Sequence, residues 1–311
     1  MTKPKKNSKT TTQLPKAITI GTFDGVHIGH QKIIEQILSL AKENSLQPTV
    51  LTLFPHPRMV LHKEDNIKLL NTIDERIELL KSFGIKEVVV KTFDTEFANL
   101  SAKNYVKTIL VDELNVKQLV IGYDHRFGKN RSADITHLKT FAKAYDFQVE
   151  EISAQDIEDV TVSSTKIRKA LIKGDVERAN SYLGYRYFIT GKVIEGKGLG
   201  KTIKFPTANI HVKENYKLIP HDGVYIVKAK IENELVFGMM NIGTNPTVDG
   251  NTHSMEVHFF NFTQDIYGCT LRVEFLKRIR NEEKFKNLEA LKIQLEKDKR
   301  SALNYINSMH D

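Results

Sequence analysis

Residues 21–30, GTFDGVHIGH, stand between an apolar run, AITI, and a stretch with helical periodicity, HQKIIEQILSLAKE. A glycine-rich turn from a strand into a helix leaves the first N–H groups of the helix unpaired, and these groups attract anions together with the helix dipole. His27 and His30 lie on either side of Gly29 in this turn. The stretch therefore predicts the first strand–loop–helix unit of a sheet.

Outward from this stretch, apolar runs alternate with helix-length segments from residue 17 to about residue 152. The strand candidates are AITIGTF, TVLTLF, EVVVKTF, QLVIGYD and QVEEI, and the helix candidates are HQKIIEQILSLAKE, TIDERIELLKSFG, SAKNYVKTILVDEL and DITHLKTFAKAYD. Thr72 and Glu75 have the spacing of a capping box, and Gly84 marks the expected end of that helix. The alternation predicts a doubly wound, Rossmann-like parallel sheet with helices on both faces.

The pattern changes near residue 185. The short β-type runs YFITGKVIEG, GVYIVKAKI, LVFGMMNIG, MEVHFFNF and TLRVEFLKRI follow one another before the helical segment NLEALKIQLEKDKRSALNYI. This order predicts an antiparallel barrel or sandwich closed by a terminal helix. We expect a basic tail over residues 1–16, a first domain over 17–184, and a second over 185–311. The helical segment SSTKIRKALIKGDVERANSYL would finish the first domain.

Composition limits the class of protein. The 311 residues are 40% hydrophobic and 27% charged, as in ordinary globular proteins. A single cysteine, Cys269, excludes an internal disulfide framework and a cysteine-based zinc site. No apolar run reaches the ~18 residues of a membrane span, and the tail has five lysines but no apolar signal core. These features predict a cytoplasmic protein with no membrane partner.

The net charge of +8 suits phosphorylated small molecules as well as nucleic acid. Outside the tail the lysines are spread along the chain, without a basic stripe that alternates with aromatic residues. Nucleic acid is therefore an unlikely partner. Oligomerisation leaves no readable sign in the sequence.

Three polar segments follow strands of the predicted sheet: GTFDGVHIGH after the first, FPHPR after the second and GYDHRFGKNRSAD after the fourth. Ligands of open parallel sheets bind beyond the carboxyl ends of the strands, so we expect a site there. Three interpretations of His27 and His30 stay open. A metal site would need further ligands that the local sequence lacks, and a structural role would have them cap the helix. Phosphate binding, with backbone approach at Gly21, Gly25 and Gly29, is favoured.

GTFDGVHIGH is similar to the HxGH signature of nucleotidyltransferases, and it resembles more closely a segment of the bacterial bifunctional riboflavin kinase/FAD synthetases. The other motifs of this family follow in order over residues 17 to about 300: FPHP, GYDHRFG, SSTKIRKAL, FPTANI, GVY, NIGTNPT, MEVHFFNF, YG and RNEEKF. The resemblance implies two ATP-dependent reactions. The second domain would phosphorylate riboflavin to FMN, and the first would transfer AMP to FMN, giving FAD and pyrophosphate.

The resemblance also assigns roles in the first domain. His27 and His30 would be catalytic and hold the ATP phosphates. The nucleotide-binding residues would be Gly21, Phe23, Asp24, Gly25, Gly29, Ser163, Ser164, Thr165 and Arg168. The flavin-binding residues would be Asp124, Arg126 and Phe127, beside a His125 that replaces an expected phenylalanine. An ordinary helix cap is the alternative for the Ser/Thr segment, and His56 in FPHP is expected to be structural.

In the second half, GKGLGKT at 196–202 misses a Walker A motif by one residue, and Pro206 disfavours the helix that should follow. It resembles instead the glycine-rich turn before PTAN in riboflavin kinases. Gly196, Gly198, Gly200 and Lys201 would bind ATP, and Thr207 and Asn209 would bind Mg²⁺. Glu256 would be the catalytic base. The flavin would lie against Asn241, Gly243 and Arg280.

Three residues depart from the family pattern where a histidine, an arginine and a glycine are expected: Glu195, Lys201 and Lys204. A bifunctional enzyme is the main hypothesis. The alternative is an FAD synthetase with an impaired or non-catalytic kinase domain, and a remote alternative is a non-enzymatic flavin or nucleic-acid binder.

Overall fold

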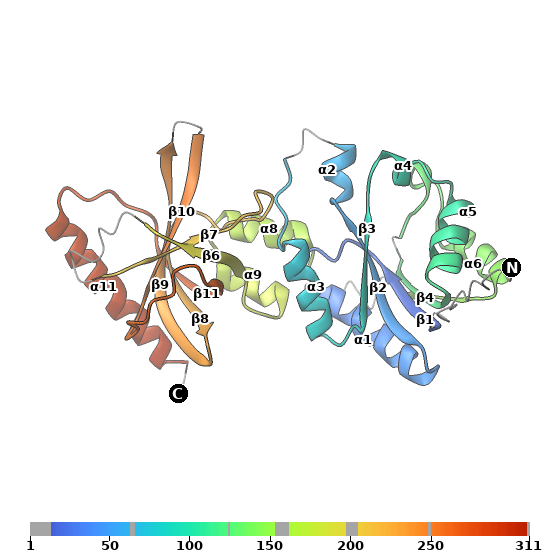
Figure 1. The fold of residues 1–311 in the computed structure, drawn as a ribbon, viewed down its shortest axis with the longest axis horizontal. Helices are drawn as coiled ribbons and strands as arrows, with labels where there is room; N and C mark the ends of the chain where they lie inside the picture. The colour runs from blue at the N-terminus through green and yellow to red at the C-terminus, as the bar shows by residue number, and fades with distance from the viewer. Residues whose placement is uncertain are drawn as a thin grey trace, which may run out of the picture. The chain divides into compact units, whose positions relative to one another are not determined.

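The computed structural model describes residues 14–62, 66–123, 125–152, 162–196, 205–247 and 250–309. Contacts divide the chain into two compact units, shown in Figure 1. Residues up to 67 and 76–161 form what we call the sheet unit, and residues 68–75 and 162–311 form the barrel unit. The contacts thus place residues 162–184 with the barrel, while the division of the catalytic domains near residue 184 stays a prediction.

The sheet unit is built on five parallel strands in the order β3-β2-β1-β4-β5. They are β1 (Lys16–Ile20), β2 (Gln47–Phe54), β3 (Glu87–Thr92), β4 (Val116–Gly122) and β5 (Gln148–Ile152). The predicted parallel sheet and its five strands are confirmed. The strand β1 pairs with β2 on one side and with β4 on the other. The direction in which strands are added therefore reverses between β1 and β4. Ligands bind at such a switch point, beyond the carboxyl ends of the strands.

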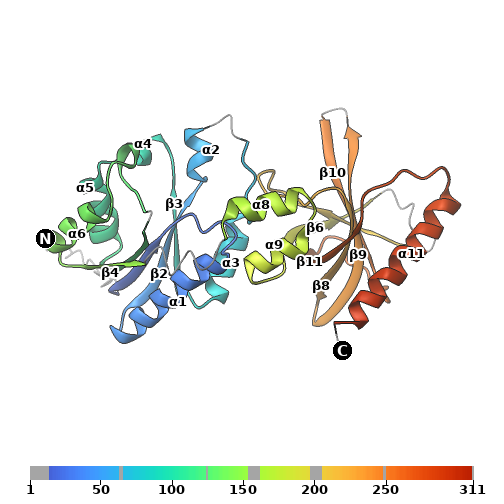
Figure 2. The same ribbon diagram turned by 180° about the vertical axis from the view of Figure 1, so that it is seen from behind.

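Helices connect these strands: α1 (Ile28–Glu43), α2 (Pro57–Leu61), α3 (Ile73–Ser82), α4 (Thr95–Ala98), α5 (Ala102–Asn104), the π-helix η1 (Tyr105–Glu113), the 3-10 turn η2 (Lys129–Arg131) and α6 (Ile135–Tyr145). The helix α1 packs against β1, β2 and β4 (Figure 2), with Ile34 and Ile37 buried. The capping box of α3 is confirmed, since Glu75 N donates to Thr72 Oγ1 at 3.1 Å and Thr72 N to Glu75 Oε2 at 2.9 Å. The helix predicted over 101–114 is instead mostly π-helical.

The barrel unit is a closed antiparallel barrel with the strand order β10-β7-β6-β11-β8-β9. Its strands are β6 (Phe188–Ile194), β7 (Ala208–His211), β8 (Gly223–Ile231), β9 (Glu234–Thr247), β10 (Gly250–Phe259) and β11 (Thr270–Arg280). Five were predicted. The sequence pattern missed β7, because four residues directly after FPT are too few for an alternating pattern. The helices are α8 (Ser164–Ile172), α9 (Val176–Leu183) and the predicted terminal helix, α11 (Leu288–Asn307).

Alternate residues of the barrel strands enter two different cores. Tyr225 and Val227 of β8 belong to a cluster that α8 and α9 extend with Ile167, Ala170, Leu171, Val176, Ala179 and Leu183. Val224 and Ile226 belong to the other cluster, which packs under Ala302 and Ile306 of α11. The terminal helix therefore covers one outer face of the barrel, and side chains at the edge of that face lie between strand and helix.

A buried ion pair joins residues 68–75 to the rest of the barrel unit. Lys217 Nζ lies 2.6 Å from Glu75 Oε2, and both side chains are almost fully buried. The same ammonium donates to the carbonyls of Leu70 at 2.7 Å and Phe188 at 2.8 Å. Glu75 Oε1 accepts from Thr190 N at 2.9 Å. Each charge thus has hydrogen-bond partners, as a buried pair requires.

Candidate active sites

One row of residues runs across the barrel through the predicted kinase site. Glu256 of β10 is directly opposite Asn209 of β7 and Asn241 of β9. The row continues from Asn241 to Val224 of β8, and from Val224 to Arg280 of β11. Directly opposed residues of antiparallel strands point to the same side of the sheet. Strand register thus brings together five residues that lie far apart in the sequence.

Glu256 sits half-buried in this row with both carboxylate oxygens engaged. Oε2 accepts a hydrogen bond from the Thr207 hydroxyl at 3.2 Å, and Oε1 accepts one from the Ser254 hydroxyl at 3.0 Å. The sequence motifs did not single out Ser254. It shares the strand face of Glu256 because it lies two residues away. These hydroxyls fix the orientation of a carboxylate that could take a proton.

A cavity of about 270 Å³ lies beside the row, between the barrel and α11. Its walls combine apolar side chains with polar and charged groups, and in small-molecule sites such polar groups fix the orientation of the ligand. They are formed by Phe205, Thr207, Val224, Met239, Asn241, Glu256, His258, Arg280, Glu282, Glu283, Phe285, Leu288, Leu291 and Leu295. We call this the helix cavity. Gly243 borders the same region, since a Cβ there would lie 2.1 Å from Glu282 Oε1.

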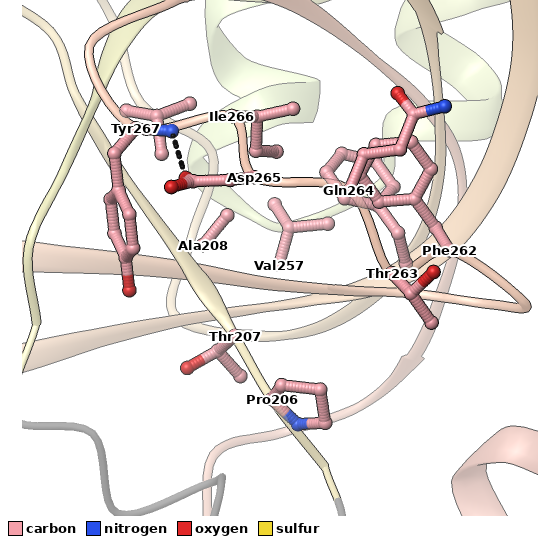
Figure 3. A pocket seen from close by; sticks show the side chains of 12 residues that line it. Pro206, Thr207, Ala208, Val257, Phe262, Thr263, Gln264, Asp265, Ile266 and Tyr267 are labelled. Atoms are coloured by element: carbon pink, nitrogen blue, oxygen red, sulfur yellow. Dashed lines mark hydrogen bonds between the residues drawn. The ribbon is translucent and has the colours of Figure 1, made fainter.

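A second cavity, of about 290 Å³, opens beside Thr207 (Figure 3). Pro206, Thr207 and Ala208 form one side, and the segment 262–267 forms another. Asp265 Oδ1 shapes that segment by accepting from Tyr267 N at 3.0 Å. We call this the loop cavity. The sequence motifs named Thr207 and placed YG at its edge, but they did not predict the segment 263–266 that forms its other side. Thr207 lines both cavities.

Thr207 and Asn209 carry side-chain oxygens of the kind that Mg²⁺ prefers, and Mg²⁺ is usually held by few protein ligands plus substrate phosphates. Asn209 also touches the glycine-rich turn, because a Cβ on Gly196 would lie 1.9 Å from its Nδ2. Within the described ranges, no three His, Cys, Asp or Glu residues cluster to hold a metal. Glu195 is exposed. Gly198, Gly200, Lys201 and Lys204 lie outside the described residues.

His258 lies in the wall of the helix cavity, two residues from Glu256. Its Nδ1 is 2.9 Å from the carbonyl oxygen of Pro206, so Nδ1 carries the proton and donates it. Burial is the main cause that lowers its pKa. This neutral histidine holds the backbone next to Thr207.

In the sheet unit, the loop after β1 adopts a strained backbone. Phe23, Gly25 and Val26 have φ values of 46°, 87° and 35°, a region that a β-branched residue such as valine rarely enters. Several contacts hold it. Gln31 Nε2 donates to Val26 O at 2.8 Å, and the fully buried Arg76 guanidinium lies 3.7 Å from the Asp24 carboxylate. Surroundings of this kind maintain strain at functional sites.

His27 and His30 stack directly on each other, with ring centroids 3.7 Å apart and an interplanar angle of 17°. A Cβ on Gly29 would lie 3.3 Å from His27 Nδ1, so glycine leaves room for that ring. His27 is the N-cap residue of α1, but its side chain makes no capping hydrogen bond. His30 Nδ1 is buried without a hydrogen-bond partner among the described residues. Burial, then His27 and Arg76, hold the pKa of His30 well below its usual value of 6.5.

The other predicted residues of the sheet unit follow β4. Phe127 is buried, 5.7 Å from the ring of Tyr105, and stacks at 6.0 Å on His125. Arg126 Nη1 lies 3.1 Å from Asp134 Oδ2. Asp124 lies outside the described residues. Tyr105, whose ring is tilted by 41° against that of Phe127, was not recognised in the sequence, because a tyrosine in a helical segment is typical of a core.

The Ser/Thr segment belongs to the barrel unit. Ser163 caps α8 by accepting from Lys166 N at 3.3 Å, as the helix-cap alternative expected. Ser164 and Thr165 form the first turn of α8, and Arg168 Nε donates to Lys68 O at 2.9 Å. Phosphate binding by this segment stays a prediction. His56 caps α2 through Nδ1, which accepts from Arg58 N at 3.2 Å and is thus structural.

Comparison with known proteins matches the two halves of the chain to two family models. The family model of FAD synthetase matches residues 9–166, and that of riboflavin kinase matches residues 183–306. A bifunctional riboflavin kinase/FMN adenylyltransferase of Bacillus subtilis is 38% identical, over 96% of this chain and 94% of its own. The protein of the same description from Haemophilus influenzae is 39% identical, over 94% of each chain.

A solved structure is also similar: a crystal structure described as a macrolide-efflux protein from Streptococcus pneumoniae. Its TM-score is 0.84 with 32% identity, covering 93% of this chain and 94% of that one. In the part of the present chain that the structure describes, no helix is long and apolar enough to cross a membrane.

Proposed function

This chain belongs to the family of bifunctional riboflavin kinase/FMN adenylyltransferases and makes FMN and FAD, and from this premise we propose where each reaction takes place. Phosphorylation of riboflavin belongs to the row through Glu256. Adenylylation of FMN belongs to the loop that holds His27 and His30. ATP and the flavins are the partners of both sites, and ATP consumption suits a cytoplasmic enzyme.

In the kinase site, riboflavin occupies the helix cavity and ATP the loop cavity. The single observation that supports this placement is that Thr207 lines both cavities beside Glu256. Glu256 takes the proton from the terminal ribityl hydroxyl of riboflavin. The oxygen of that hydroxyl attacks the γ-phosphorus of ATP, and ADP leaves. Thr207 and Asn209 would hold Mg²⁺, which neutralises phosphate charge when bound. Asn241, Gly243 and Arg280 border the flavin, and Gly196 borders the phosphates. The ATP-binding roles that the sequence predicts for Gly198, Gly200 and Lys201 concern residues outside the described ranges.

In the adenylyltransferase site, an oxygen of the FMN phosphate attacks the α-phosphorus of ATP, and pyrophosphate leaves. No covalent enzyme intermediate is needed, so positioning and charge stabilisation carry the catalysis. The strained loop and the N-terminus of α1 present backbone N–H groups, and the paired imidazoles of His27 and His30 donate hydrogen bonds to the phosphates. His30 Nδ1, which is buried and has no hydrogen-bond partner among the described residues, supports a bound ligand here.

Two substitutions separate the sites. His30→Ala should reduce FAD formation from FMN by about 100-fold or more, and leave FMN formation from riboflavin intact. Glu256→Gln should do the reverse, because it removes a general base whose contribution is about 100-fold or more. Both are measured by chromatographic separation of riboflavin, FMN and FAD after incubation with ATP and Mg²⁺.

Each variant serves as the other's control for folding. Loss of both activities from either substitution would contradict independent sites. Wild-type protein that makes FAD from supplied FMN but returns riboflavin unchanged would favour the impaired kinase that Glu195, Lys201 and Lys204 suggested.

A further inference from the structure

Arg280, the last residue of β11, lines the helix cavity. Its guanidinium forms an ion pair with Asp298 of α11. Nε lies 2.9 and 3.1 Å from the two carboxylate oxygens of Asp298, and Nη2 lies 2.8 Å from Oδ2. Asp298 is 1% exposed. A side-on, charge-assisted pair of this kind fixes both distance and plane of the guanidinium.

The remaining contacts of Arg280 leave it able to bind a ligand. Nη1 donates to Asn281 O at 2.9 Å. Among the contacts of the described residues, Nε, Nη1 and Nη2 are thus each engaged once or more by the protein. Arginine has five N–H donors, so one N–H on each Nη remains. The guanidinium carbon also lies 5.6 Å from the Phe285 ring centroid, and both residues line the cavity.

We infer that Asp298 is a positioning residue for flavin binding, which acts by holding Arg280 so that its two remaining Nη protons serve polar atoms of riboflavin. This rests on the proposed placement of riboflavin in the helix cavity. Arg280 would bind the flavin equally before and during phosphoryl transfer. Its loss should therefore raise the KM for riboflavin without changing kcat.

The test is steady-state kinetics of FMN formation. Asp298→Asn keeps the shape of the side chain but removes the charge, and it should raise the KM for riboflavin about tenfold, with kcat and the KM for ATP within about twofold. Arg280→Lys should do the same, because lysine lacks the planar fork. The double variant should be no worse than the more affected single variant, because both substitutions remove one unit.

Two matched variants identify a merely structural effect. Leu303→Ala loosens the packing of α11 without touching Arg280, and Gln294→Met removes only the 2.8 Å hydrogen bond from Gln294 to Asp298. Both should leave the KM for riboflavin unchanged. FAD formation from FMN, measured on every variant, reports on the sheet unit of the same molecules. A KM that rises equally in Leu303→Ala would overturn the inference.

The remaining outcomes are also decisive. If Arg280→Lys leaves the KM for riboflavin unchanged, the proposed placement of riboflavin fails. If Arg280→Lys raises the KM for riboflavin and Asp298→Asn does not, only the proposed role of Asp298 fails. The same conclusion follows if the two effects on the KM add in the double variant. Should Asp298→Asn not fold, Asp298→Glu keeps the charge but displaces the carboxylate by one methylene, and an unchanged KM there would contradict the inference.

Discussion

His30 has a pKa held well below 6.5, first by burial and then by the nearby His27 and Arg76. The imidazole is therefore neutral at physiological pH before substrates bind. A neutral ring has one donor and one acceptor nitrogen, so it can donate to a phosphate only from the nitrogen that carries the proton. Its partner in the stack limits how the ring can turn.

This lowered pKa predicts a pH dependence of stability. The unfolded chain protonates His30 near pH 6.5, whereas the native protein does not until lower pH. Between those values the unfolded state binds more protons, so stability rises with pH and is lost as pH falls. His30 should contribute a slope of at most about 1.4 kcal/mol per pH unit to the free energy of unfolding.

Denaturant unfolding between about pH 5 and 7, followed by circular dichroism, measures this slope. His30→Gln should remove it. NMR titration of the His30 ring in the native protein should give a pKa below 6.5. A native pKa at or above that value would contradict the prediction.

At the scale of elements, the sequence patterns predicted those helices and strands that interactions between neighbouring residues determine. The capping box at Thr72 and Glu75 and the five strands of the parallel sheet depend on near neighbours or on long apolar runs. The strand β7 was missed because its four residues are held by pairing with β6 and β10, distant in sequence. The row through Glu256 depends on strand register, so motifs could name its members but could not place them opposite one another.

The Lys217–Glu75 pair predicts a large effect of one element on another. Glu75→Gln removes the carboxylate that lies 2.6 Å from the buried Lys217 ammonium. Leaving a buried charge without its partner should lower the free energy of unfolding by about 3–5 kcal/mol. The measurement is the temperature at which riboflavin kinase activity is lost on heating, which should fall.

The exposed pair Lys91–Glu113 provides the control, and Glu113→Gln should cost at most about 1 kcal/mol. The double variant Glu75→Gln/Lys217→Met should recover part of the loss, because it leaves no unpaired charge. A stable Glu75→Gln single variant would mean that the two backbone carbonyls suffice for Lys217.

At the scale of the whole molecule, composition and motif order were enough for the two activities and both fold classes. They were not enough for the loop cavity, for Asp298 or for Tyr105. Each of these depends on segments that meet only after folding. Their residue types also gave no sign of a role. An aspartate in a highly charged helix, for example, is usually exposed to solvent.

Residues 162–184 give a prediction for fragments of the barrel unit. Ile167, Leu171, Val176 and Leu183 are buried in the larger barrel core. A fragment of residues 162–311 should therefore melt at a higher temperature than one of residues 185–311, which exposes the apolar surface that these side chains cover. Both should melt below the full chain, because they lack Glu75. Thermal unfolding followed by circular dichroism gives the order, and equal melting temperatures would contradict it.

The place of Glu75 also bears on recombination between relatives of this enzyme. A crossover anywhere between residues 76 and 216 joins the Glu75 of one parent to the Lys217 of the other. A chimera that combines one of these two residues with an uncharged residue at the other position would then bury a charge without this ion pair. In libraries of hybrid flavin-forming enzymes, the residues at positions 75 and 217 should therefore come from the same parent.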